Sequence, residues 1–233
     1  MGSAGAGSGE GAGSGAGTER GKRAAALVAA GLVEDHMRVG LGTGSTVAHL
    51  LPALAERGLA IRCVATSPAT QAAARRLGLD VRPFSSSGRL DLAIDGADQV
   101  EVSGWLVKGG GGAHTREKVV ASAAERFVVI VSSDKLVDHV RAPVPLELLA
   151  FGVGATLSLL GTARRRDAPR TPDGGVLADY LGAVEDPEAL AMMLAAVPGV
   201  VEHGLFPPSM VSEVLVGVPS ADSAVVRRFT PAR

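Results

Sequence analysis

Cysteine, aromatic residues, surplus charge and long apolar runs are all scarce in this chain of 233 residues. The single cysteine, Cys63, excludes an internal disulfide, which is typical of a reducing compartment. The net charge is only -1 and aromatics are 3%, so neither a broad basic surface nor stacking platforms for nucleic acid are expected. The longest nearly uncharged stretch, Leu148 to Leu160, is shorter than the ~18–20 residues that span a bilayer. We therefore expect a cytoplasmic protein that binds no nucleic acid and no membrane.

Glycine is abundant, with 31 residues, and it is concentrated first at the N-terminus. Residues 1–17 are almost wholly Gly, Ala and Ser and lack the basic and apolar regions of a signal peptide, which predicts a flexible tail. Thr18 is expected to cap a helix over residues 19–30. Beyond it, short apolar segments alternate with helical patterns, which predicts a parallel sheet covered by helices. The expected strands are 37–41, 60–65, 90–94, 105–107 and 127–131, and the expected helices are 46–57, 68–77 and 115–126.

The rhythm changes after Pro145. A strand, a helix over 152–163, a hairpin-like segment near 173–175, a helix over 187–196 and a strand over 200–206 follow one another, which is typical of a ferredoxin-like unit. A last strand, 214–218, is expected to return to the main sheet. The predicted fold is α/β: a Rossmann-like open parallel sheet with helices on both faces and a smaller α+β (ferredoxin-like) domain. The predicted division is a tail at 1–17, a catalytic domain at 18–140 and 213–233, and a small domain at 141–212.

A glycine-rich segment, residues 40–46, ends the first expected strand and opens a helix. Free backbone N–H groups and the helix dipole make such a place an anion site, which suits a phosphate. NAD is disfavoured, because Ser45 stands where the dinucleotide fingerprint needs its third glycine and no acidic residue follows the second strand. A P-loop is excluded because no Gly-Lys-Ser/Thr triplet is present. The alternative is a plain turn capped by Ser45 or Thr46.

Asp95 and Asp98 follow the apolar strand 90–94, at the carboxyl edge where open α/β sheets bind their ligands. Two carboxylates there can bind sugar hydroxyls, share protons or hold a metal. A metal is disfavoured because no His or Cys falls at a recognisable ligand spacing nearby. For an isolated Asp-Gly-Ala-Asp string, an Asx turn is the simpler interpretation.

Lys108 is followed by four glycines, the most unusual string in the chain. Such a run costs backbone entropy, and close approach of backbone N–H groups to a ligand is a physical reason for it; a flexible surface loop is the alternative. Glu117 lies in the first turn of the next expected helix, where it complements the dipole even without a catalytic role. Lys135 follows another strand at the same edge and suits a phosphate contact or a solvated surface. The arginine run at 164–166 is interpreted as solvated.

Together these segments resemble ribose-5-phosphate isomerase of type A, in unbroken order from about Lys22 to Val218. The matching segments are Gly40–Thr46, Thr66–Ser67, Asp95–Asp98, Lys108–Ala113, Thr115–Lys118, Lys135, Pro143–Pro145 and Pro198–Phe206. The resemblance implies interconversion of ribose 5-phosphate and ribulose 5-phosphate in the non-oxidative pentose phosphate pathway, with no metal and no cofactor. It also implies a homo-oligomer, a dimer or a tetramer.

The resemblance also implies roles for individual positions. It places phosphate binding at Thr43, Gly44, Ser45 and Thr46, assisted by Lys135. It places catalysis and sugar binding at Glu117 as the base, Lys108, Asp95 and Asp98, with Gly96, Ala97, Gly109, Gly110 and Gly111 lining the substrate site. Whether Asp95 or Asp98 assists ring opening is left open. The competing hypotheses are a non-catalytic sugar-phosphate sensor and an amino-sugar-phosphate deaminase-like enzyme on the same fold.

Overall fold

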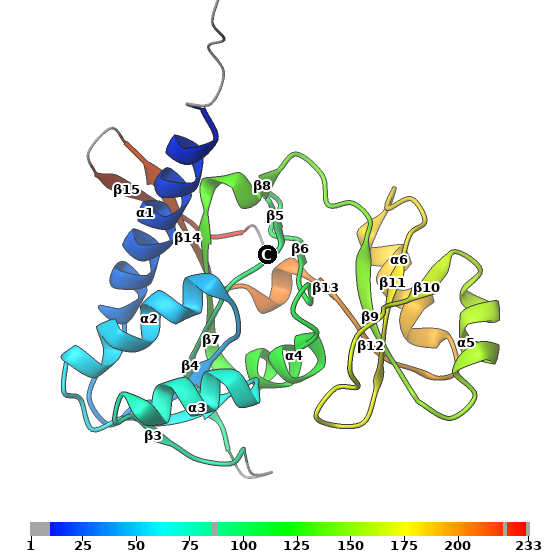
Figure 1. The fold of residues 1–233 in the computed structure, drawn as a ribbon, viewed down its shortest axis with the longest axis horizontal. Coiled ribbons are helices and arrows are strands. Elements are labelled where there is room, and N and C mark those ends of the chain that lie inside the picture. Colours follow the sequence, from blue (N-terminus) through cyan, green and yellow to red (C-terminus); the bar gives the residue numbers. More distant parts are fainter. Residues whose placement is uncertain (1–9, 85–87, 221–222, 232–233) are drawn as a thin grey trace, which may run out of the picture.

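A computed structural model describes residues 10–84, 88–220 and 223–231 (Figure 1). Seven strands form the main sheet, in the spatial order β3-β2-β1-β4-β7-β14-β15. All neighbours in it are parallel except the β14–β15 pair at one edge. This order, with helices on both faces, confirms the predicted α/β fold. The strands are β1 (Arg38–Leu41), β2 (Arg62–Ala65), β3 (Asp80–Val81), β4 (Leu90–Asp95), β7 (Ala124–Ser132), β14 (Glu213–Pro219) and β15 (Ala224–Phe229).

Four helices cover the main sheet: α1 (Glu10–Ala30), α2 (Ser45–Glu56), α3 (Pro68–Arg76) and α4 (His114–Ser122). Alternate residues of the central strands separate the two faces, as the period of two requires. Val128 and Ile130 of β7 pack in the cluster that holds the buried residues of α1, α2 and α3. Val129 and Val131 pack in a second cluster with the buried residues of α4. The chain therefore leaves β1 on one face and β4 on the other.

The expected flexible tail is wrong for residues 10–17, which are helical, while residues 1–9 lie outside the described residues. Helix α1 begins at Glu10, well before the expected cap at Thr18. A Cβ on Gly21 would come within 2.6 Å of the Gly217 carbonyl oxygen on β14, so only glycine permits this close approach of helix to strand. Gly17, one turn earlier, packs against Pro219. Gly21 lies within the helix expected over 19–30, so this close approach does not depend on the glycines of the expected tail.

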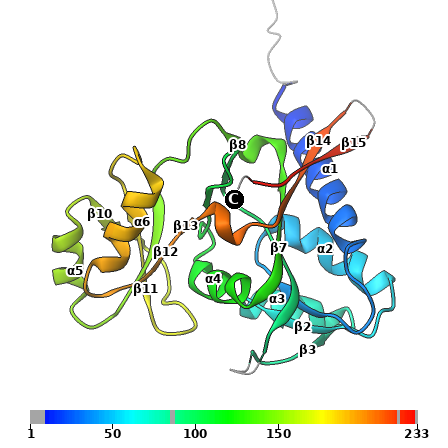
Figure 2. The ribbon, with the colours of Figure 1, turned by 180° about the vertical axis from the view of Figure 1, so that it is seen from behind.

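The second sheet lies beside the main one in both views (Figures 1 and 2). Its strands are β9 (Val144–Leu148), β10 (Ala163–Arg165), β11 (Val176–Tyr180) and β12 (Val200–His203), in the antiparallel order β10-β11-β9-β12. Helices α5 (Val153–Leu160) and α6 (Pro187–Ala196) complete the β-α-β-β-α-β pattern of the predicted ferredoxin-like unit. Helix α6 has the predicted bounds, and it begins at Pro187 because Asp186 accepts hydrogen bonds from the N–H groups of Glu188 and Ala189.

A third, small sheet lies between the two larger ones, in the order β13-β6-β5-β8. Its strands are β5 (Gln99–Glu101), β6 (Leu106–Val107), β8 (Leu136–Val137) and β13 (Leu205–Phe206). The strand expected over 200–206 is broken at Gly204. That glycine donates its N–H to the Pro145 carbonyl at 2.7 Å and accepts the Lys108 N–H at 2.9 Å. The predicted domain division stays a prediction. Strand β13 falls inside the predicted small domain, 141–212, yet it pairs with β6 of the predicted catalytic domain.

Helix α4 is shorter than the sequence predicts. The helix expected over 115–126 ends at Ser122, because Ala124 already pairs with Leu90 of β4 and Arg126 with Leu92.

Within the residues that the structure describes, no helix is both long and apolar enough to cross a bilayer.

Candidate active site

The predicted site residues come together at the carboxyl end of the main sheet. Strands β1 and β4 are neighbours there, and because the chain leaves them on opposite faces, their ends open a crevice. A cavity of about 150 Å³ lies in it. Its lining contains every predicted site residue except Asp95: Thr43, Gly44, Ser45, Thr46, Gly96, Ala97, Asp98, Lys108, Gly109, Gly110, Gly111, Glu117 and Lys135.

One wall of the cavity is the N-terminus of α2. Gly44 is its N-cap, with a φ of 124°, and no side chain caps the helix, so the alternative of a turn capped by Ser45 or Thr46 is not what the structure has. The N–H groups of the first turn therefore keep their capacity to bind an anion. Thr43 is held from behind, because its hydroxyl lies 2.8 Å from that of Thr66 and its N–H donates to the Asp95 carboxylate at 3.0 Å.

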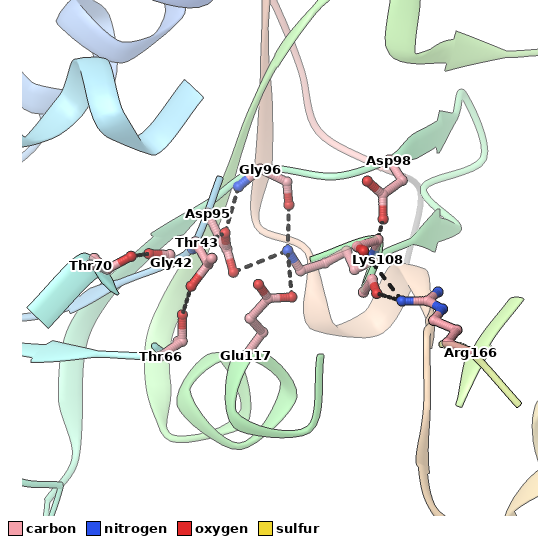
Figure 3. A network of polar contacts seen from close by, with 12 residues as sticks. Gly42, Thr43, Thr66, Thr70, Asp95, Gly96, Asp98, Lys108, Glu117 and Arg166 are labelled. Atoms are coloured by element: carbon pink, nitrogen blue, oxygen red, sulfur yellow. Dashed lines mark hydrogen bonds and ion pairs between the residues drawn. The ribbon is translucent and has the colours of Figure 1, made fainter. Parts of the chain in front are cut away.

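The floor of the site is a buried cluster of three charged side chains, Asp95, Lys108 and Glu117 (Figure 3). The Lys108 ammonium lies 3.0 Å from an Asp95 carboxylate oxygen and 3.2 Å from one of Glu117. It also donates to the Gly96 carbonyl. Each of the three side chains is at most 5% exposed. Asp95 ends β4, Lys108 follows β6 and Glu117 lies in the first turn of α4, so three separate elements meet here.

Burial and the neighbouring charges together set the pKa values of this cluster. Burial raises the pKa of Glu117 to about 8, the nearby charge of Asp95 adds to the rise, and Lys108 opposes it. Burial also raises the pKa of Asp95, against the opposing effect of Lys108 and of two backbone N–H groups. Burial by itself would lower the pKa of Lys108, yet the two facing carboxylates leave that pKa above its usual value. Glu117 is therefore a carboxyl that changes protonation near neutral pH beside a permanent cation, as acid–base chemistry requires.

Two more predicted residues, Asp98 and Lys135, also line the cavity. Asp98 accepts a hydrogen bond from the Gly110 N–H at 2.7 Å. Lys135 ends the short 3-10 turn Ser133–Lys135 after β7, and its side chain is 39% exposed with Asp134 at 3.7 Å. Unlike the buried cluster, this ammonium reaches the cavity from its rim.

Sequence reasoning missed Arg166, which was interpreted as part of a solvated run. Its guanidinium lies against the glycine loop and donates to the Gly109 carbonyl at 2.8 Å and to the Gly110 carbonyl at 3.2 Å. Arg164 and Arg165 beside it are exposed. Nothing in a run of three arginines distinguishes the one that points inward, because that direction depends on how β10 packs.

Among the described residues, no group of three or more His, Cys, Asp or Glu side chains lies together as metal ligands would. The fold and the site define an α/β protein whose crevice combines an uncapped helix N-terminus, able to accept an anion, with a buried carboxyl–ammonium pair, able to exchange protons. Comparison with known proteins defines it more closely.

The sequence profile of ribose 5-phosphate isomerase A (phosphoriboisomerase A) matches residues 62–221. The chain is 45% identical over 225 residues to ribose-5-phosphate isomerase A of Methylorubrum extorquens, covering 88% of this chain and 95% of that protein. Identity to the Methanosarcina acetivorans protein of the same name is 44% over 211 residues, which are 84% of this chain and 89% of the relative. The chain belongs to the ribose 5-phosphate isomerase A family.

Solved structures agree with this assignment. Ribose 5-phosphate isomerase A from Methanocaldococcus jannaschii superposes with a TM-score of 0.82 at 31% identity, covering 91% of this chain and 99% of that one. A D-ribose-5-phosphate isomerase in complex with phospho-erythronic acid superposes with a TM-score of 0.84, also at 31% identity and with the same coverage. The family and the fold are therefore supported by sequence and by structure.

Proposed function

We propose that this chain interconverts D-ribose 5-phosphate and D-ribulose 5-phosphate, an aldose–ketose isomerisation of the non-oxidative pentose phosphate pathway. The observation that carries the proposal is the position of Glu117. Its carboxyl, with a pKa of about 8, lines the same cavity as the α2 N-terminus, so a base and a phosphate site share one small space. A relative 31% identical to this chain was solved with phospho-erythronic acid, which is itself a phosphorylated sugar acid.

The reaction needs one proton to move between two adjacent carbons. In the open-chain aldose, the ionised Glu117 takes the proton from C2, and the electrons of that C–H bond form the C1=C2 double bond while O1 becomes an oxyanion. Lys108 and N–H groups of the glycine loop stabilise this enediolate. The O2 proton then moves to O1, and Glu117 returns its own proton to C1. The products are the C2 ketone and an unchanged enzyme.

The two aspartates are proposed to have different roles. Asp95 lies beneath the cavity, where the N–H groups of Thr43 and Gly96 and the Lys108 ammonium occupy its oxygens. We assign Asp95 to holding Lys108 in place. Asp98 lines the cavity and retains an oxygen beyond the one that Gly110 contacts. We assign Asp98 to the sugar hydroxyls and to the proton transfer that opens the ring.

Phosphate binding is proposed for residues 43–46 with Lys135. An ammonium at the rim and backbone N–H groups at the helix end offer a charged and a directional contact to the same anion. The glycines at 109–111 line the same cavity, in which we place the sugar carbons between the phosphate site and Glu117.

The two competing functions are less consistent with the geometry. A deaminase-like enzyme would need a catalytic histidine, but His114 is completely buried, does not line the cavity, and burial lowers its pKa to about 4. A non-catalytic sensor would need the phosphate site without a base, whereas Glu117 lies beside Lys108 at 3.2 Å.

A cytoplasmic location and a homo-oligomeric state, as a dimer or tetramer, remain proposals that rest on the family resemblance. Large apolar side chains exposed on the ferredoxin-like unit are compatible with self-association. Examples are Phe151, 87% exposed, and Leu159, 65% exposed. Sedimentation of the purified chain measures the oligomeric state directly.

The function is tested by product analysis with the purified full chain. Ribose 5-phosphate should give ribulose 5-phosphate, also after exhaustive chelation, and glucosamine 6-phosphate should give no ammonia. Binding of ribose 5-phosphate without turnover would support the sensor instead. Activity that disappears with the chelator and returns with a divalent ion would contradict the metal-free mechanism.

The pH dependence of kcat/KM follows from the state of Glu117. The base must be ionised, and since burial raises its pKa to about 8, only about a tenth is ionised at pH 7. We expect kcat/KM to rise about tenfold per pH unit below pH 7 and to level off above pH 8. A steady-state series at constant ionic strength checks this. A flat profile across that range would show that Glu117 is not the titrating base.

A further inference from the structure

The glycine loop of the active site, Lys108–Gly112, needs an external restraint, because glycines do not hold one conformation by themselves. Gly109 and Gly112 have φ values of 105° and 74°, in the region that favours glycine. Three of these glycines and Lys108 line the cavity. Any disorder of the loop therefore displaces the groups that face the substrate.

Arg166 is a side chain from the ferredoxin-like unit that restrains this loop by hydrogen bonds. One guanidinium nitrogen donates to the carbonyls of Gly109 and Gly110. The other two donate to the Asp179 carboxylate at 2.8 and 2.6 Å, a paired contact that fixes the plane of the guanidinium. Arg166 follows β10 and Asp179 lies on β11, so the restraint is built on paired strands of the second sheet.

The Gly110 residue is held from both directions. Its N–H donates to Asp98 and its carbonyl accepts from Arg166. Asp98 lines the cavity, whereas Arg166 does not. Arg166 therefore reaches the substrate only through the loop.

We propose that Arg166, oriented by Asp179, is a positioning residue for the isomerisation: it fixes the Gly109 and Gly110 peptides and so the loop that carries Lys108. The proposal rests on the proposed function of the site. The phosphate site at residues 43–46 lies on a different wall, so Arg166 affects the reacting carbons more than the anchoring of the phosphate. Preorganisation of this kind lowers the barrier without a contact to the substrate.

The test is the kinetics of Arg166→Ala, with Arg165→Ala as the matched control because that neighbouring arginine is exposed. At a temperature where all variants are folded, we expect Arg166→Ala to lower kcat at least tenfold and to change KM less than threefold. Millimolar guanidinium should restore part of the lost kcat. Arg165→Ala should match the wild type. A folded Arg166→Ala enzyme with kcat within twofold of wild type would overturn the proposal.

Two further variants keep the test decisive. Arg166→Lys retains the charge but cannot hold Asp179 and the loop together, so its kcat should fall severalfold even if Arg166→Ala does not fold. Asp179→Asn should lower kcat in the wild-type background and have no further effect in Arg166→Ala, because it acts through the arginine. Wild-type kcat in Arg166→Lys, or additive losses in the double variant, would contradict the proposal.

Hydrogen exchange separates this proposal from the proposed function. The amides of Gly109–Gly111 should exchange faster in Arg166→Ala than in the wild type, whatever reaction the site performs. If the wild type fails to isomerise ribose 5-phosphate, the proposed function fails and this loop measurement still decides the restraint. Unchanged exchange in the loop would overturn the restraint itself.

Discussion

Replacing Glu117 by Gln should lower kcat by about 10²–10⁴-fold, the usual loss when a positioned general base is removed. Gln keeps the size of the side chain but cannot accept the C2 proton, so binding of a sugar-phosphate analogue should survive. If Glu117 served only the dipole of α4, the substitution would change stability by about 0.3–1 kcal/mol and leave the rate nearly unchanged. The measurements are kcat, inhibitor affinity and exchange of the C2 proton with deuterated solvent.

Glu147→Gln is the matched control for this prediction. Glu147 is buried to the same degree as Glu117, but it accepts hydrogen bonds from Thr115 and Thr171 and does not line the cavity. We expect this control to lose stability and to retain kcat. Near-normal turnover in folded Glu117→Gln would remove the base from the mechanism and leave Asp98 as the next candidate.

Replacing Lys108 by Met should have the second large effect, a fall in kcat of about 10²–10³-fold, as expected for a lost oxyanion donor. The loss has a further consequence. Without the ammonium, Asp95 and Glu117 face each other with no neutralising charge, so the pKa of Glu117 should rise beyond about 8. The rise of kcat/KM with pH should therefore move to higher pH than in the wild type.

Lys118→Met is the matched control for Lys108→Met, because it separates a loss of catalysis from a loss of stability. Lys118 is also largely buried, pairs with Glu202 at 2.7 Å and, like Lys108, lies over the Phe206 ring, but it does not line the cavity. Removing one partner of a buried ion pair costs about 3–5 kcal/mol, so both variants should melt at lower temperature. Only Lys108→Met should raise the activation barrier of the reaction and so lower kcat. Equal kcat in the two variants would argue against a catalytic role for Lys108.

Local sequence signals correctly predicted the helices that begin at a capping side chain followed by a proline. Asp186 and Pro187 begin α6 at the expected residue, and Ser67 caps α3 by accepting the Thr70 N–H. Elements whose limits depend on a distant partner were predicted less well. The early end of α4 and the unexpected strand β15 both follow from pairing with other strands, which no local pattern encodes.

Composition, like local pattern, does not reveal contacts with distant parts of the chain, as the N-terminal helix shows. Gly, Ala and Ser together indicated a flexible tail, because such residues offer little apolar surface for packing. The structure instead makes residues 10–17 the first turns of α1, and places Gly17 beside Pro219 of β14. Composition cannot distinguish a linker from the start of a helix that lies beside a strand, since both can be rich in small residues.

The sequence by itself determined the alternation of strands and helices, the family resemblance, and which residue types line the cavity, because motifs at strand ends meet at one sheet edge. Only the tertiary structure decided how they act. It places Asp95 beneath Lys108 and Asp98 in the cavity, although both lie in one four-residue string. It raises the pKa of Glu117 through burial, and it brings Arg166 to a loop more than fifty residues away. The burial of a side chain, the charges beside it and its long-range contacts all arise from packing, and local sequence does not contain them.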